Sequence, residues 1–136
     1  MNINIYDELL ECLIAYNNDH NDENYGNTVV PFANSKPTFP LTIFDEIRNM
    51  PTRYNSCHDK VSSLGYKVEI YAKTKGNITK QTIAREIAKL MDDFLSGIVG
   101  LKQVSFNANS LINDASIYQI IITYENSYHE NRAKFI

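Results

Sequence analysis

The sequence predicts an α+β fold, a single domain in which a mixed β-sheet of about four strands carries two helices packed on one face. Two stretches space their apolar residues three and four positions apart, the pattern of an amphipathic helix. Other stretches alternate apolar and polar residues or are rich in β-branched and aromatic side chains, which favours strands. Their order is helix, strand, strand, helix, strand, strand. A chain of 136 residues suits one domain, 1–136.

The first helix is predicted over residues 3–16. Its apolar residues form two adjacent rows at helical spacing, which together make a wide stripe. The rows are Ile3, Tyr6, Leu10, Leu13 and Ile5, Leu9, Cys12, Tyr16. Residues 17–27 have almost no apolar content, so we expect a loop there.

The sequence of residues 28–65 predicts little regular structure. A pair of valines precedes an alternating run, and these apolar residues are Val29, Val30, Phe39, Leu41 and Ile43. Pro37 and Pro40 cannot donate ladder hydrogen bonds, so a strand here is expected to be an edge strand or to begin late. Residues 49–65 are polar and rich in turn-forming residues, which predicts a loop.

A half-buried strand is predicted from Tyr66 to Lys73, because apolar and polar residues alternate strictly there. Residues 75–77, centred on Gly76, then turn the chain.

The helix after this turn is predicted to begin with Thr79 as its N-cap and to end at Gly97. Ile78 precedes the cap and is expected to pack on Ile83 as a hydrophobic staple. The apolar face of the helix carries Ile83, Ile87, Leu90, Phe94 and Leu95. Asp92–Asp93 lies between apolar positions and is expected to face solvent.

Two further strands complete the predicted sheet. Residues 100–107 form the first, with Val104 and Phe106 pointing inward. Residues 116–125 are the most strand-like run and are apolar on both faces, which indicates a central strand or a face covered by another subunit. Residues 127–136 are expected to form a short C-terminal tail.

Composition and charge exclude several classes of protein. The formal charge of −3 gives no overall attraction to nucleic acid or anionic membranes, although a local basic patch remains compatible with it. No apolar run approaches the roughly 20 residues that span a bilayer. The N-terminal segment carries acids where a signal peptide carries bases, so export is not expected. Cys12 and Cys57 lie in unrelated contexts, which favours a reduced cytosolic chain.

The strand, basic glycine turn and helix start at residues 66–94 raise the question of a phosphate-binding loop. Such a loop needs several glycines whose N–H groups converge on phosphate, and only Gly76 stands here. We therefore expect a turn before a capped helix. Lys73, Lys75 and Lys80 still gather positive charge at this corner, which makes them a candidate basic docking patch for an acidic partner or a DNA backbone.

Catalytic and metal-binding patterns are weak. Lys67 and Glu69 share a strand face, but their order is the reverse of the acid-x-lysine order of many metal-dependent nucleases, and Asp45–Glu46 adds acids without a specific spacing. Cys57–Asp59 has the sequence Cys-His-Asp, but three side chains that are adjacent in sequence cannot easily point at one atom. The other two histidines lie in separate polar segments without ligand spacing. We expect no catalytic residue, no cofactor, no metal site and no enzymatic activity.

Surplus apolar residues are the remaining feature, because one small two-layer domain cannot easily bury all of them. Exposed apolar surface of this kind usually marks an interface, and packing under the loops is the alternative for each residue. The candidate subunit or partner interface consists of Tyr71, Ile117, Ile121, Tyr128, Phe135 and Ile136.

The order of segments carries a resemblance over nearly the whole chain. After the N-terminal helix come KPTFPLTIFDE, YKVEIYAKTK, IAREIAKLMDDFL, GLKQVSFN and YQIIITYENSYHENRAKFI. This layout of an extended segment, a strand, a helix, two strands and a tail resembles the small tail-terminator and tail-completion proteins of long-tailed bacteriophages and prophages.

The resemblance implies a homo-oligomeric ring, usually a hexamer, that caps the phage tail tube, ends its polymerisation and joins it to the head. It implies a tail tube protein and a head–tail connector protein as partners, non-specific contact with DNA in the lumen, and no membrane. The location would be the virion tail or neck, after synthesis in the host cytoplasm. A head-completion or head–tail connector protein is the alternative within the virion, and a metal-dependent nuclease is the alternative of a different class.

Overall fold

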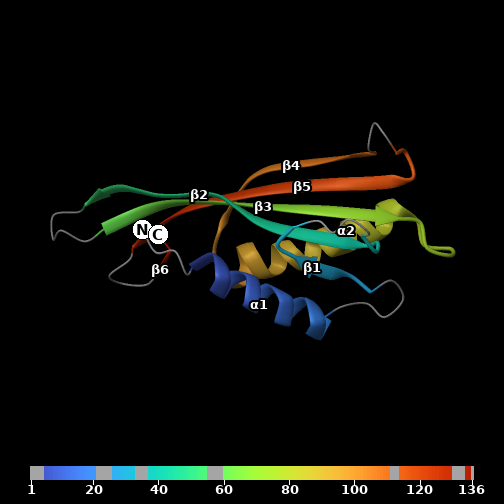
Figure 1. Ribbon diagram of the computed structural model, residues 1–136, viewed down its shortest axis with the longest axis horizontal. Helices are drawn as coiled ribbons and strands as arrows, with labels where there is room; N and C mark the ends of the chain where they lie inside the picture. The colour runs from blue at the N-terminus through green and yellow to red at the C-terminus, as the bar shows by residue number, and fades with distance from the viewer. Residues whose placement is uncertain are drawn as a thin grey trace.

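A mixed sheet with two helices forms the fold, and the computed structural model confirms the predicted α+β class (Figure 1). The structure describes residues 5–20, 26–32, 37–54, 60–110, 114–129 and 134–135. The elements are α1 (Ile5–His20), β1 (Thr28–Val30), β2 (Leu41–Tyr54), β3 (Lys60–Lys73), α2 (Lys80–Asp92), the π-helix η1 (Asp93–Ile98), β4 (Lys102–Ser110), β5 (Ile117–His129) and β6 (Lys134–Phe135).

The sheet has six strands, more than the sequence predicts. The strands follow the order β1-β2-β3-β5-β4, and β6 pairs with β5 off this path. The β1–β2 pair is parallel and the other pairs are antiparallel, so the sheet is mixed, as predicted. The additional strands are short: β1 has 3 residues and β6 has 2, too few to produce a readable alternation.

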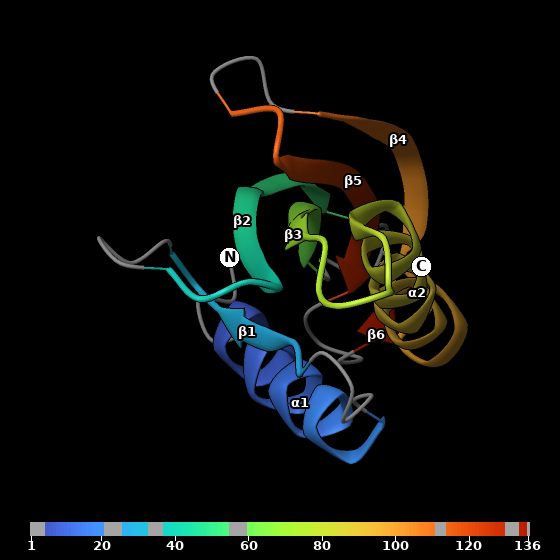
Figure 2. The ribbon, with the colours of Figure 1, turned by 90° about the vertical axis from the view of Figure 1, so that its right-hand side faces the viewer.

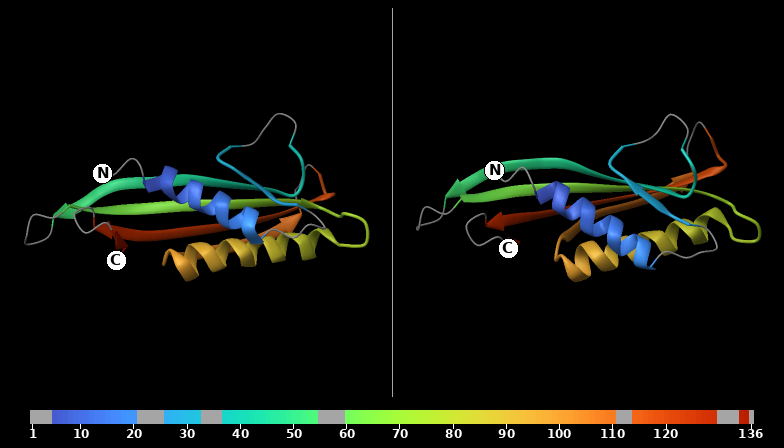
Figure 3. Two further views of the ribbon diagram at one scale, coloured as in Figure 1. Left: turned by 90° about the horizontal axis from the view of Figure 1, so that it is seen from below. Right: turned by 60° about the horizontal axis from the view of Figure 1, so that its bottom comes forward.

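Both helices lie on the same side of the sheet (Figures 1 and 3). Viewed along the strands, α1 lies beside β1 at one flank of the molecule, and α2 lies near β5 and β4 at the other (Figure 2). α2 packs mainly on β3 and β5, and α1 packs on β1. The two helices therefore cover different parts of one sheet face and meet where Tyr16 of α1 packs against Phe94 of η1.

The core lies between this sheet face and the helices. Every second residue of β3 from Leu64 to Ala72 is fully buried, which confirms the alternation predicted for that strand. β5 supplies Tyr118, Ile120, Ile122 and Tyr124 to the same face. The helices supply Ile5, Leu9, Leu13, Ile83, Ala84, Ile87, Ala88, Met91, Phe94 and Leu95.

The long β2–β3 hairpin corrects the loop predicted over residues 49–65. β2 continues to Tyr54 and β3 already begins at Lys60, with antiparallel pairing along both strands. Register shifts occur between Glu46 and Arg48 and again beyond Pro51, where the extra residue is accommodated. The polar composition misled the prediction because backbone pairing continues along both strands through this segment, although Leu64 and Ser62 within it are buried.

Part of residues 17–27, which were predicted to form a loop, is also regular or buried structure. α1 continues to His20, and Asn17 within it is buried. The amide Nδ2 of Asn17 donates to the carbonyl oxygen of Asn27 at 3.0 Å, and the amide of Asn27 donates to Asn17 Oδ1 at 3.0 Å. Thr42 Oγ1 donates to Asn27 Oδ1 at 2.9 Å. This buried network joins α1 to the start of β1 and to β2.

The second helix begins as predicted and ends differently. The Thr79 side chain accepts a hydrogen bond from the Thr82 N–H, which confirms the N-cap, and Ile78 packs against the core. At its end the helix widens into η1, where the Val99 N–H bonds the Phe94 carbonyl at 2.9 Å. The residue with positive φ is Gly100 (φ 91), so the chain leaves the helix later than the predicted stop at Gly97.

β4 and β5 resolve the remaining predictions for the sheet. β5 lies between β3 and β4, which confirms a central strand. Phe106 points toward the helix side of the sheet, as predicted, but is 48% exposed because β4 is the edge strand. Val104 is the extra residue at a register shift and is 55% exposed, so its predicted inward position is wrong. Residues 127–129 pair with β3 as the end of β5, so the segment expected to follow the last strand as a tail begins inside that strand.

Among the described residues, no helix is long and apolar enough to cross a membrane.

Candidate interaction surfaces

The basic corner is a two-residue hairpin turn followed by a capped helix. The Lys75 N–H donates to the Ile78 carbonyl and the Ile78 N–H donates to the Lys75 carbonyl, each at 3.0 Å, with Gly76 at φ 59 between them. The Lys80 N–H donates to Thr74 Oγ1 at 3.2 Å. The N–H groups of Lys75, Ile78 and Lys80 therefore already have partners within the chain, which agrees with the turn predicted from the sequence.

The corner lysines do not all extend freely into solvent. Lys73 Nζ lies 4.8 Å from the centre of the Phe39 ring, a cation–π contact. Lys80 Nζ donates to the Ala115 carbonyl. Hydrogen bonds from Ser116, and then the charges of Lys73 and Lys80, hold the pKa of Asp114 below its usual value. Lys73 and Lys80 therefore take part in local contacts at this corner.

The sheet face opposite the helices brings several predicted interface residues together. Tyr71 Oη donates to Glu69 Oε2 at 2.7 Å, and Gln119 Nε2 donates to Tyr71 Oη at 3.0 Å. Lys67 Nζ lies 2.7 Å from Glu69 Oε1. Burial, followed by the bond to Glu69, raises the pKa of Tyr71 to about 12. Ile121 lies next to Glu69 in the β3–β5 register and is half-buried.

Part of this face is hollowed into a pocket of about 270 Å³. Its lining combines strand residues with the segment before β2: Pro37, Phe39, Leu41, Ile43, Glu69, Tyr71 and Ile117. Ile117, predicted as an interface residue, is only 9% exposed, so it contributes little surface.

Lys67 and Glu69 are the lysine and the acid that were considered for nuclease chemistry, and their side chains form an ion pair with one another.

The remaining predicted positions lie at the C-terminus and in the hairpin tip. The backbone of Tyr128 in β5 pairs with that of Phe135 in β6. Ile136 and Cys57–Asp59 lie outside the described residues. Among the residues that are described, no three histidine, cysteine, aspartate or glutamate side chains gather as a metal site.

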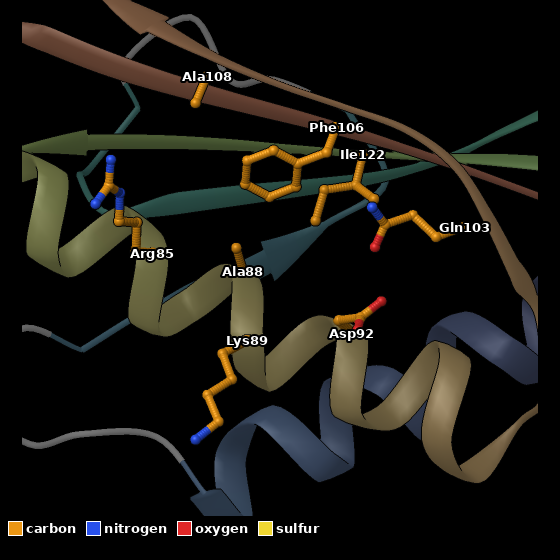
Figure 4. A pocket seen from close by; sticks show the side chains of 8 residues that line it. All are labelled: Arg85, Ala88, Lys89, Asp92, Gln103, Phe106, Ala108 and Ile122. Carbon is orange, nitrogen blue, oxygen red and sulfur yellow. The ribbon is translucent and has the colours of Figure 1, made fainter.

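A groove between α2 and the edge strand β4 is a surface that sequence reasoning missed. It has a volume of about 340 Å³ and is lined by Arg85, Ala88, Lys89, Asp92, Gln103, Phe106, Ala108 and Ile122 (Figure 4). The Phe106 ring projects into it above Ala88. The signal in the sequence is the small residue on each wall, Ala88 and Ala108, which leaves room that larger side chains would fill.

Asp92 closes one end of this groove. Its Oδ1 accepts a hydrogen bond at 2.8 Å from the hydroxyl of Tyr124, which is buried. Burial, then the bond to Asp92, raises the pKa of the Tyr124 hydroxyl above its ordinary value. Asp92 was expected to face solvent, and instead it anchors α2 to β5.

Comparisons with known proteins add no relative. No protein family model matches the chain, and no curated protein matches it.

Proposed function

We propose that the protein is a structural assembly subunit that forms a closed ring, caps the tail tube of a long-tailed bacteriophage, ends its polymerisation and joins it to the head. The observation that carries this proposal is the open apolar groove along the edge strand β4, into which the half-exposed Phe106 projects. An apolar groove beside an unpaired strand edge is a typical docking surface for another chain.

The arrangement of the sheet supports a ring rather than a symmetric dimer. Its two edges differ: β1 with α1 forms one flank, and β4 with α2 forms the other. A contact between unlike surfaces is heterologous, and when the rotation it generates closes, the product is a ring. Hexamers are the expected size from the family resemblance.

The proposed action is binding by shape and charge, without a cofactor and without catalysis. The partners are the tail tube protein on one side and a head–tail connector protein on the other, and the site of action is the virion tail or neck. Lys73, Lys75 and Lys80 form the candidate docking patch toward the tube, with DNA in the lumen as a second contact.

Negative-stain microscopy with light scattering on the purified protein tests this function. Closed rings, or rings that appear when tail tubes are added, are the expected result. A protein that stays monomeric at all concentrations and leaves tubes uncapped would contradict the proposal. Rings that bind connector or portal assemblies and ignore tubes would assign the chain to the head-completion class, and magnesium-dependent DNA cleavage by the monomer would assign it to the nucleases.

A further inference from the structure

The groove between α2 and β4 combines an apolar floor with a rim of unlike charges. Ala88 and Ile122 are buried below, and the ring of Phe106 remains 48% exposed. Arg85 and Lys89 are exposed on the α2 side, Arg85 at one end and Lys89 between it and Asp92 on the outer side of the helix. Asp92 lies at the other end, opposite Gln103 (Figure 4). A partner that fits this groove must place small apolar side chains over the floor and acidic side chains at the end where Arg85 lies.

The outward face of α1 has this composition. Among its exposed side chains, five that are spaced one, three or four residues apart form one stripe beside the buried face. The stripe consists of Glu8, Glu11, Cys12, Ala15 and Asp19. Its acids lie mainly toward the N-terminal half, and Cys12 and Ala15 are small enough to approach a projecting ring.

The surroundings of α1 are also electronegative. Burial, then the charges of Asp45, Asp7 and Glu46, raise the pKa of Tyr6 to about 12. α1 itself carries the exposed acids Asp7, Glu8, Glu11 and Asp19 and no lysine or arginine, whereas the α2 side of the groove presents Arg85 and Lys89. The two surfaces lie on opposite flanks of the molecule, so one chain cannot bring them together (Figure 2).

We propose that the groove between α2 and β4 receives the outward stripe of α1 from a second copy of this chain, which joins neighbouring subunits head to tail. This inference rests on the proposed ring and names the contact that builds it. Charge complementarity selects the second copy as the occupant: acids meet Arg85 and Lys89, and Cys12 and Ala15 cover Phe106.

The charges also set the direction of the incoming helix. Glu8 to Ala15 and Arg85 to Asp92 each span about two turns, roughly 10 Å at 1.5 Å per residue. If Glu8 and Glu11 face Arg85 and Lys89, Ala15 falls beside Asp92 and avoids placing an acid there. The α1 helix of one subunit thus runs parallel to the α2 helix of the next.

Charge reversal with mixing tests the contact. The variant Arg85→Glu/Lys89→Glu and the variant Glu8→Lys/Glu11→Lys are each expected to raise the concentration at which rings dissociate by at least about tenfold. Mixed in equal amounts, they restore assembly, because each provides an intact surface for the other and the two reversed surfaces are again complementary. Restoration also shows that both variants fold.

A matched pair on β4 tests the apolar part. Phe106→Ser is expected to abolish rings, whereas Val104→Ser leaves them intact, because Val104 is equally exposed on the same strand but does not line the groove. Equal effects of the two substitutions would overturn the groove as the docking site.

Crosslinking tests the direction. In a Cys12→Ser/Cys57→Ser background, a short bis-maleimide is expected to link subunits into ladders beyond dimers for the pair Glu8→Cys/Ala108→Cys and for the pair Ala15→Cys/Gln103→Cys. The crossed pair Glu8→Cys/Gln103→Cys is expected to give few links. Preferential linking of the crossed pair would overturn the parallel direction.

The outcomes separate this inference from the proposed function. Rings that persist unchanged in both charge-reversal variants and in Phe106→Ser refute the α1–groove contact and leave the ring-forming function standing. Absence of rings in the wild-type protein, with and without tail tubes, refutes both.

Discussion

Thr79 fixes the start of α2 through a single hydroxyl group. Its backbone is extended (φ −70, ψ 150), and its Oγ1 accepts the Thr82 N–H at 3.3 Å. The sequence was sufficient to predict this cap because a cap depends only on residues within one turn.

Replacing Thr79 with alanine is expected to lower the free energy of unfolding by about 1 kcal/mol, because an N–H group of the first turn loses its acceptor. Thr79→Ser keeps the hydroxyl and serves as the matched control, with stability close to wild type. Urea unfolding of the three proteins provides the measurement. Equal losses in both variants would show that the methyl group of Thr79, and not its hydroxyl, stabilises the helix start.

Tyr71 links alkaline pH to stability. Burial and the bond to Glu69 raise its pKa to about 12 in the folded protein, above the ordinary value of about 10. The folded state therefore holds this proton more tightly than the unfolded state, so the stabilisation is complete below about pH 10 and is lost as the pH rises toward 12. Tyr71→Phe is expected to reduce this alkaline decline, measured as urea midpoints at several pH values, with pH 8 as the internal reference. An unchanged decline in the variant would assign it to other groups, including Tyr6.

The buried hydrogen-bond network around Asn27 marks the limit of residue-level prediction. Asn17 and Asn27 read as loop residues because they are polar and lie in a polar segment. Their burial follows from the position of α1 against β1 and β2, which no local pattern contains. Once buried, these amides must be paired with one another, and they become part of the core.

At the scale of elements, the β2–β3 hairpin shows why a strand can escape detection. Strand patterns are readable where one face is buried, as in β3 from Leu64 to Ala72. Farther along the hairpin the side chains are polar, and exposed partners such as Arg48 and Glu125 pair across strands at 3.1 Å. Backbone pairing can sustain such a strand without any hydrophobic alternation in the sequence.

Gly65 lies where the hairpin bulges against Ile47. A Cβ atom at residue 65 would stand 3.0 Å from Ile47 Cγ1 and 3.3 Å from Arg48 Cβ. Gly65→Ala is therefore expected to cost about 1 kcal/mol of stability. In an Ile47→Ala background the same change is expected to cost less, because the closer of the two contacts is removed and alanine restricts the unfolded chain. Thermal unfolding of the four proteins of this double-mutant cycle measures the coupling, and additive effects would contradict a contact at the bulge.

For the molecule as a whole, periodicity was sufficient to predict the α+β class, and apolar residues on both faces of β5 were sufficient to indicate a central strand as one of two possibilities. The residues of the candidate interface were harder to predict from the sequence. Ile117 was chosen for its apolarity but is only 9% exposed, whereas Phe106 was expected to be packed inside and is 48% exposed on an edge strand. Exposure at an edge depends on how far α2 extends over β4, and that distance is a property of the assembled fold.

The formal charge of −3 is small for the whole molecule, so charge can guide assembly only through local patches such as the corner lysines. Replacing Lys73, Lys75 and Lys80 with glutamine is expected to weaken docking onto tail tubes and to leave ring formation intact, because the corner is separate from the α2–β4 groove. Cosedimentation with tubes at salt concentrations from about 0.05 to about 0.5 M measures docking, and light scattering checks the ring. Exposed charges are largely screened beyond about 10 Å in 0.1 M salt, so wild-type docking falls steeply with salt and the triple variant shows a shallower dependence. Identical docking curves for the two proteins would remove the corner from the tube interface and leave shape complementarity as the basis of capping.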